Sequence, residues 1–254
     1  MIENGSSSVQ TYSPDELRII SDSLENSEPQ EILRWALTAF GDKLTMATAF
    51  GAEGCVIIDM MSRLRDETGI TPDIFNLDTG YQFQETLEMR DTMQERYGLP
   101  IRFVRAKESV RQMEARLGGS IYASNPTLCC YQRKVVPLRE ALHGFSAWVS
   151  AIRRDQTPER ATQPIVGPEP KYENLVKINP LANWTKDQVW DYIGANNVPT
   201  NPLHDQGYPS IGCYPCTRPV GQGEDDRAGR WAGLDKRECG LHLGADGKLV
   251  RAAS

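Results

Sequence analysis

Short strand-like runs alternate with helical segments over most of this 254-residue chain, and this alternation restricts the fold more than any other feature. The predicted strands are 43–49, 73–77, 101–105, 147–152 and 175–178, and the predicted helices between and after them are 55–64, 82–97, 108–117, 129–142 and 185–196. Such alternation is typical of a parallel sheet that helices cover on both faces. We therefore predict an α/β fold built on a twisted parallel sheet.

Helix-start signals precede this alternating region. Ser13-Pro14-Asp15-Glu16 combines an N-cap serine, a proline at the first helical position and a glutamate at the third, and residues 27–30 repeat the signal before a helix that ends at Gly41. Thr185 caps the last clear helix, and Pro137 predicts a kink in the helix 129–142.

The ends of the chain differ in character from its centre. Residues 1–12 are polar and predicted to be disordered, and 13–223 are predicted to form one domain. Proline and glycine are dense from 198 to 223, and residues 224–254 are charged with almost no apolar run. We predict that 224–254 form a mobile C-terminal segment, because long irregular stretches in compact chains are usually functional or mobile.

Composition excludes several classes of function. The net charge of −6 argues against a general nucleic-acid binder, and no apolar run has the roughly 18–20 residues that span a membrane. The N-terminus has no secretory signal pattern, so we expect a cytoplasmic protein in a reducing compartment. Six cysteines in such a compartment indicate metal binding or redox catalysis more than disulfides. A homo-oligomer remains compatible with the sequence.

Two close cysteine pairs are the strongest chemical signal. Cys129 and Cys130 are adjacent, and Cys213 and Cys216 flank Tyr-Pro. Four thiolates in two pairs fit tetrahedral zinc or a [4Fe–4S] cluster. Adjacent cysteines on one ion are cramped, which favours the cluster and leaves zinc as the alternative. A thioredoxin-type pair is disfavoured, because the second pair lies late in a loop rich in proline and glycine.

A lone cysteine near the C-terminus has another character. Lys236 and Arg237 precede Cys239, and His242 follows it. Cations near a thiol favour the reactive thiolate, so Cys239 is a candidate nucleophile with these three residues as possible support. The alternative is an exposed cysteine without a role. Cys55 lies on an apolar helix and is expected in the core.

Two glycine-containing turns follow the first two strands. Parallel sheets bind ligands at the carboxyl ends of their strands, and helix N-termini there attract anions. Residues 50–54 and 77–80 occupy such positions, which makes Gly51, Leu77, Thr79 and Gly80 candidate substrate contacts. The alternative for each turn is a purely structural role, and neither turn contains the Gly-Lys-Ser/Thr of a phosphate-binding Walker loop.

Cationic side chains cluster after predicted elements of this acidic chain. The guanidinium fork suits phosphate and sulfate oxygens. The candidates for anion binding are Lys134, Arg153, Arg154, Arg160, Arg227 and Arg230, with a solvated surface position as the alternative for each.

The order of these motifs resembles one family. Cys-Cys-x-x-Arg-Lys, Arg-Arg-Asp-Gln-Thr-Pro, Cys-Tyr-Pro-Cys-Thr, Arg-Ala-Gly-Arg-Trp and Lys-Arg-Glu-Cys-Gly-Leu-His are together similar to the assimilatory sulfonucleotide reductases. Within that family, the motifs resemble the iron–sulfur-containing adenylyl-sulfate (APS) reductases. The resemblance implies an adenine nucleotide α-hydrolase-like fold and a [4Fe–4S] cluster on the four paired cysteines.

The resemblance also implies a reaction. Cys239 would attack the sulfur of APS and expel AMP, and thioredoxin or a similar dithiol would release sulfite from the resulting S-sulfonate. The two turns match the family's nucleotide-binding loops, and the six cations match its phosphosulfate-binding positions. The first turn departs from the family's frequent Ser-Gly-Ala-Glu-Asp, because Phe50 and Gly54 replace the serine and the aspartate.

Two alternative functions stay open. One is a reductase of the same fold that uses the 3'-phosphorylated substrate PAPS, or both nucleotides. The other is a redox-sensing nucleotide-binding protein, in which a cluster or zinc senses the redox state.

Overall fold

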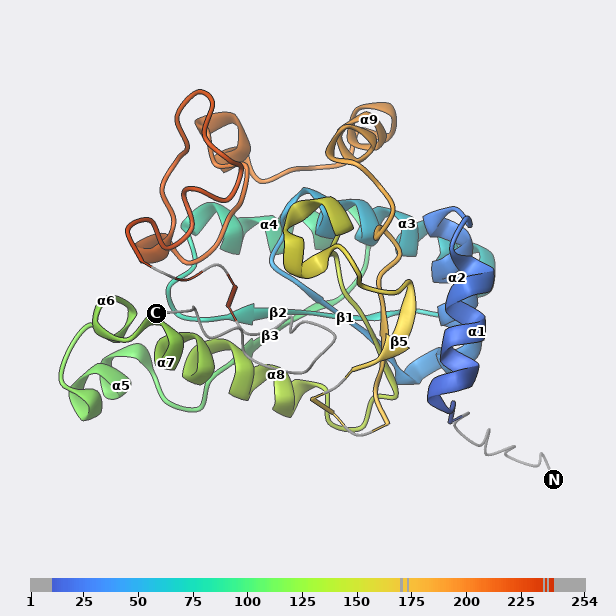
Figure 1. Cartoon of the computed structure of the whole chain (residues 1–254), viewed down its shortest axis with the longest axis horizontal. Helices are drawn as coiled ribbons and strands as arrows, with labels where there is room; N and C mark the ends of the chain where they lie inside the picture. The colour runs from blue at the N-terminus through green and yellow to red at the C-terminus, as the bar shows by residue number, and fades with distance from the viewer. Residues whose placement is uncertain (1–10, 170, 173, 235, 237, 240–254) are drawn as a thin grey trace.

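A six-stranded sheet forms the centre of the computed structural model, which describes residues 11–169, 171–172, 174–234, 236 and 238–239. The strand order is β3-β2-β1-β4-β6-β5 (Figure 1). The strands are β1 (Leu44–Thr48), β2 (Asp73–Asp78), β3 (Ile101–Arg105), β4 (Ala147–Val149), β5 (Val166–Pro168) and β6 (Val176–Ile178). The chain order reverses between the neighbouring strands β1 and β4, which is the place where such sheets bind ligands.

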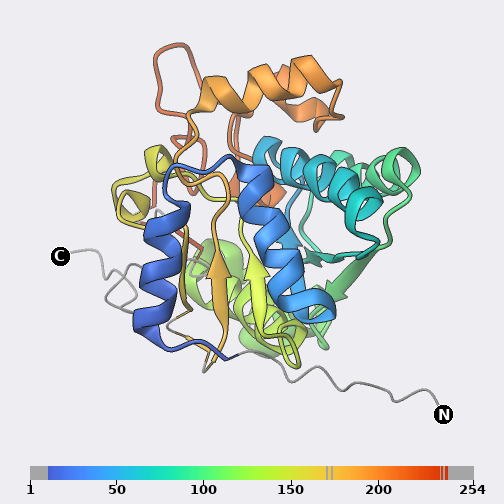
Figure 2. The same ribbon diagram turned by 90° about the vertical axis from the view of Figure 1, so that its right-hand side faces the viewer.

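Nine α-helices surround this sheet in the described part of the chain. They are α1 (Pro14–Leu24), α2 (Pro29–Phe40), α3 (Ala52–Thr68), α4 (Gln84–Tyr97), α5 (Val110–Leu117), α6 (Ile121–Ser124), α7 (Pro126–Cys130), α8 (Val136–Ala141) and α9 (Lys186–Asn196). Capping boxes at Ser13 and Thr185 begin α1 and α9, as the sequence predicts. In Figure 2, α1 and α2 lie side by side in front of the strands.

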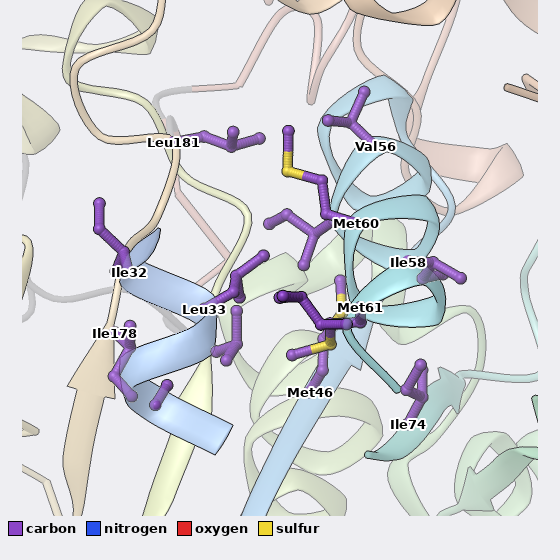
Figure 3. Packing of buried hydrophobic residues seen from close by; sticks show 14 of the residues in the cluster. Ile32, Leu33, Met46, Val56, Ile58, Met60, Met61, Ile74, Ile178 and Leu181 are labelled. Atoms are coloured by element: carbon purple, nitrogen blue, oxygen red, sulfur yellow. The ribbon is translucent and has the colours of Figure 1, made fainter. Parts of the chain in front are cut away.

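Helices cover both faces of the sheet, which confirms the predicted fold class. On one face, the apolar sides of α2 and α3 meet β1, β2 and β6, and Figure 3 shows Leu33, Met46 and Met61 packed together there. On the other face, Leu138 of α8 packs with Phe75 and Trp148 from the strands. Burying apolar side chains on both faces is the main stabilising contribution in such a sheet.

Two local expectations require correction. The sheet is not wholly parallel, because β5 pairs with β6 in the antiparallel direction at the edge. Its last residue, Pro168, is tolerated at an edge because a missing N–H there breaks no interior ladder. The irregularity predicted at Pro137 lies instead in the π-helical turn Tyr131–Val135 (η2), which joins α7 to α8 just before the proline.

The segment that carries the last three cysteines lies at the carboxyl end of the parallel strands, where Figure 1 shows it in orange and red. Arg218 N–H donates to the Gly229 carbonyl at 3.0 Å, and Trp231 N–H donates to the Cys216 carbonyl at 2.9 Å. Gly229 and Trp231 are therefore hydrogen-bonded to the loop of the second cysteine pair, across the predicted boundary at 223.

The predicted N-terminal segment 1–12 lies mostly outside the described residues. Its described end is packed, because the Tyr12 ring lies 5.8 Å from Phe40 and 6.4 Å from Trp35, measured between ring centroids. In the described residues no helix has the length and apolarity that crossing a membrane requires.

Candidate active site

The turn between β1 and α3 presents the start of a helix to a cavity. Phe50 has a positive φ of 54° and is fully buried, and its N–H donates to Thr48 Oγ1 at 3.1 Å. This bend makes Gly51 the N-cap of α3, and no side chain caps the helix there. The first N–H groups of α3 therefore stay available to an anion or a hydroxyl group.

The turn after β2 is fixed from several sides. Asp78 accepts hydrogen bonds from the Gly80 N–H at 2.9 Å and from Arg105 Nε at 2.6 Å. The buried Arg133 donates to the Thr79 carbonyl at 2.7 Å. Thr79 Oγ1 lies 3.2 Å from Cys213 Sγ, so this turn connects the sheet to the second cysteine pair.

A cavity of about 840 Å³ lies between these turns and the C-terminal segment. Gly51, Leu77 and Thr79 line it at the sheet. Five of the six predicted cationic residues also line it: Lys134, Arg153, Arg160, Arg227 and Arg230. The structure thus brings together groups that lie up to 179 positions apart in the sequence, from Gly51 to Arg230.

Two predicted substrate contacts do not line this cavity. Arg154 Nε donates to the Gln163 carbonyl at 2.8 Å, and its other nitrogens bind Glu25 and Asn183. Gly80 has a φ of 75°, and a Cβ there would meet Val110 at 2.7 Å, so this glycine serves the turn.

The four paired cysteines line one smaller cavity. Cys129 and Cys130 end α7, whose N-terminus is capped by the Asn125 side chain, which accepts from the Leu128 N–H at 3.0 Å. Cys213 and Cys216 come from the loop above, held by a hydrogen bond of 2.8 Å from Tyr214 N–H to the Tyr81 carbonyl. Both cysteine pairs therefore line the same cavity.

These thiols do not converge on a single point. Within the described residues, no three His, Cys, Asp or Glu side chains are grouped so that they could hold one metal ion. Successive helix positions point about 100° apart, so Cys129 and Cys130 face different directions around the cavity. Burial raises the pKa of Cys129 to about 12 and that of Cys130 to about 11, with neighbouring thiolates adding to both shifts.

A shared wall separates the cysteine cavity from the larger one. Lys134, Cys213, Arg230 and Trp231 line both cavities. Burial acts to lower the pKa of Lys134, but the thiolates of Cys213, Cys239 and Cys130 outweigh it and raise the pKa. Lys134 therefore keeps its charge between the two sites.

Cys239 lines the larger cavity and is partly exposed. Lys236 Nζ lies 3.3 Å from Thr127 Oγ1 and 5.3 Å from the centroid of the Trp231 ring. These contacts place the chain before Cys239 against the start of α7. Arg237 and His242, predicted as support for this cysteine, lie outside the described residues.

Acidic residues of the cavity were missed by the sequence reasoning. Glu53 binds Arg153, and Glu238 pairs with Arg160 at 2.9 Å. Both carboxylates line the cavity. The available signals were the position of Glu53 inside the predicted first turn and that of Glu238 directly before the predicted nucleophile.

Comparison with known proteins agrees with this geometry. Residues 43–219 match the phosphoadenosine phosphosulfate reductase domain family. Adenosine 5'-phosphosulfate reductase 2 of Bacillus subtilis (strain 168) is 47% identical over 213 residues, covering 84% of this chain and 88% of that protein. The adenosine 5'-phosphosulfate reductase of Salinibacter ruber (strain DSM 13855 / M31) is 42% identical over 236 residues, 92% of each protein.

Solved structures give the same result for the fold. Phosphoadenylyl-sulfate (PAPS) reductase from Candida auris, in a phosphate complex, superposes with a TM-score of 0.72 at 32% identity and covers 83% of this chain and all of that one. FMN adenylyltransferase from Candida glabrata, with FAD and pyrophosphate, has a TM-score of 0.55 at 14% identity, covering 82% of this chain and 68% of that one, and shares the fold alone. These matches confirm the family expected from the motifs.

Proposed function

The chain belongs to the phosphoadenosine phosphosulfate reductase family, and we propose that it reduces adenosine 5'-phosphosulfate to sulfite and AMP with electrons from thioredoxin or a similar dithiol. The observation that carries this proposal is the position of Cys239. A partly exposed thiol lines the cavity that five of the predicted cations and two strand-end turns also line.

Different residues of this cavity would contact the adenosine and the phosphosulfate parts of the nucleotide. Gly51 and the open N-terminus of α3 would meet polar groups of the adenosine moiety, with Leu77 and Thr79 on the neighbouring turn. The phosphosulfate would lie toward Lys134, Arg227 and Arg230. Arg230 Nε is buried without a hydrogen-bond partner among the described residues, so it has a donor to offer an anion.

The chemistry begins at Cys239. Its thiolate attacks the sulfur of the phosphosulfate, an S–S bond forms, and the sulfur–oxygen bond to AMP breaks with the electron pair leaving on the phosphate. Cationic side chains reduce the repulsion between thiolate and substrate and stabilise the charge that develops on AMP. The product on the protein is a Cys239 S-sulfonate.

A dithiol completes the reaction. One thiolate of the reductant attacks Cys239 Sγ and displaces sulfite, and its second thiol resolves the mixed disulfide and regenerates the Cys239 thiol. The two electrons therefore come from the reductant, which becomes a disulfide. A thioredoxin-type partner implies a reducing compartment such as the cytoplasm.

A [4Fe–4S] cluster fits the four paired cysteines. Cys129, Cys130, Cys213 and Cys216 line one cavity, and this supports a cluster in which each thiolate binds a separate iron. When bound, the cluster would supply local charge beside Lys134 rather than the two reducing electrons. Thr79 Oγ1, at 3.2 Å from Cys213 Sγ, would donate a hydrogen bond to that ligand.

The test is turnover of anaerobically purified protein with reduced thioredoxin and either APS or PAPS, with sulfite and the visible spectrum recorded. We expect a brown protein that forms sulfite from APS and poorly from PAPS, and no sulfite from the Cys239→Ser variant. Equal turnover of PAPS would indicate a dual reductase. A colourless wild-type protein that forms no sulfite from either nucleotide would favour the redox-sensing alternative.

A further inference from the structure

The carboxylate directly before Cys239 is held by two arginines. Arg160 Nε and Nη2 donate to the two oxygens of Glu238, each at 3.0 Å, and Arg227 Nη2 lies 3.6 Å from the same carboxylate. The side chains of Arg160 and Glu238 are only 9% and 17% exposed. A bidentate pair of this kind fixes geometry as well as charge.

The hydrogen bonds of Arg160 are directed to protein groups. Its third nitrogen, Nη1, donates to Gln156, so all three guanidinium nitrogens bind the protein. Arg230 differs, because its guanidinium lies on Gly212, where a Cβ would come within 2.5 Å, and its Nε has no hydrogen-bond partner in the described part of the chain. Of the two arginines, only Arg230 has a buried guanidinium nitrogen without a hydrogen-bond partner among the described residues.

The chain geometry connects the ion pair to the thiol. Consecutive Cα atoms lie about 3.8 Å apart, so a fixed Glu238 leaves the next residue little freedom of position. In the same C-terminal segment, Lys236 contacts Thr127 and lies three positions before Cys239. Without the Glu238 pair, the described residues of this segment would keep that more distant contact, and Cys239 would be held less firmly.

We propose that Glu238 is a positioning residue, which binds Arg160 and thereby holds Cys239 in the cavity for attack on the substrate. This inference rests on the proposed function and assigns Arg160 to the Cys239 segment instead of the substrate. Paired with Arg160 and Arg227, the Glu238 carboxylate also presents little free negative charge to a dianionic substrate.

The first test is a single turnover without thioredoxin, in which peptide mass spectrometry follows S-sulfonate formation on Cys239 at saturating APS. Glu238→Gln is expected to slow this step about 10-fold, to change the APS Kd less than about 2-fold and to speed alkylation of Cys239 by iodoacetamide. Glu224→Gln is the matched control, because Glu224 forms an exposed pair with Arg218 outside the cavity and should behave as wild type. An unchanged rate, or a loss due only to weaker APS binding, would overturn the proposal.

The second test is a double-mutant cycle with Arg160→Gln. If Arg160 acts through Glu238, the double variant will be about as slow as either single variant, near 10-fold. Multiplied losses, near 100-fold, would show that Arg160 acts on the substrate independently and would refute the assignment. Variants are compared after their urea midpoints are shown to match wild type. Adduct formation by wild type separates this test from the proposed function, which fails if wild type forms no adduct on Cys239.

Discussion

Two adjacent residues after the first cysteine pair have different tasks. Arg133 is 4% exposed, and its guanidinium donates to the carbonyls of Thr79 and Glu108, which join the turn after β2 to the start of α5. Lys134 lies in the wall between the two cavities. The first residue maintains the shape of the site, and the second supplies charge to it.

We predict that substitutions separate these two tasks. Arg133→Lys should lower the free energy of unfolding by about 1–3 kcal/mol, because an ammonium group cannot reproduce the fork that binds both carbonyls. Lys134→Gln should leave the unfolding free energy within about 0.5 kcal/mol of wild type but lower kcat/KM for APS about 10- to 100-fold. Urea denaturation and sulfite release measure the two quantities. A stability loss at Lys134 equal to that at Arg133 would contradict the distinction.

Gly54 has a packing reason for departing from the frequent aspartate of its family. A Cβ at this position would lie 2.7 Å from Thr48 Oγ1, the atom that accepts the Phe50 N–H. Gly54→Ala should therefore destabilise the protein by about 1–3 kcal/mol.

Thr48→Ala removes the obstructing oxygen and provides the control. The double variant should be no less stable than Thr48→Ala alone, measured as the free energy of unfolding in urea. Additive losses in the double variant would mean that Thr48 is not the obstacle.

At the scale of elements, α9 is attached to α3 by a buried polar contact. Tyr192 on α9 donates to Asp59 Oδ2 at 2.6 Å, and Arg63 donates to the same carboxylate at 2.9 Å. The Asp59 side chain is 3% exposed. Since α9 leads into the segment that carries the second cysteine pair, this contact supports the cavity from a distance.

Tyr192→Phe is expected to cost about 1–3 kcal/mol of unfolding free energy, because a buried carboxylate loses one of its donors.

Burial raises the pKa of Tyr192, so the folded state retains a proton that the unfolded state loses above about pH 10. The stability of the wild type therefore falls above that pH. The free energy of unfolding of Tyr192→Phe should fall less than that of the wild type above about pH 10. Tyr131→Phe, at an exposed position, is the control. An identical stability loss at Tyr131 would contradict this account.

At the scale of the whole molecule, an acidic chain gathers cations at one place. The net charge is −6, and six carboxylates and Lys186 line the cavity at the carboxyl ends of the strands, yet five predicted cationic side chains also line it. They come from the turn after α7, from the loop after β4 and from the C-terminal segment. The fold thus brings together cations that lie far apart in the sequence, which the total charge does not reveal.

Local signals made most of the fold predictable. Capping at Ser13 and Thr185 depends on neighbours within one helical turn, and strands such as β3 are visible as short runs rich in β-branched and aromatic residues. The strand β5 was missed because two of its three residues are Gly167 and Pro168, which are depleted in strands.

The contacts of individual site residues were less predictable. Arg153 and Arg154 are adjacent, but only Arg153 lines the cavity, because Arg154 binds Glu25, 129 positions away. The pair of Arg160 with Glu238 spans 78 positions. Such pairings depend on how separate elements pack, which no local pattern contains.

The most direct test of the account is mass spectrometry of the protein after incubation with APS in the absence of any dithiol. We predict one added SO3 group per chain, on the peptide that contains Cys239, and its loss with release of sulfite when reduced thioredoxin is added. No adduct, or an adduct on another cysteine, would contradict the central claim that Cys239 attacks the sulfur of the substrate.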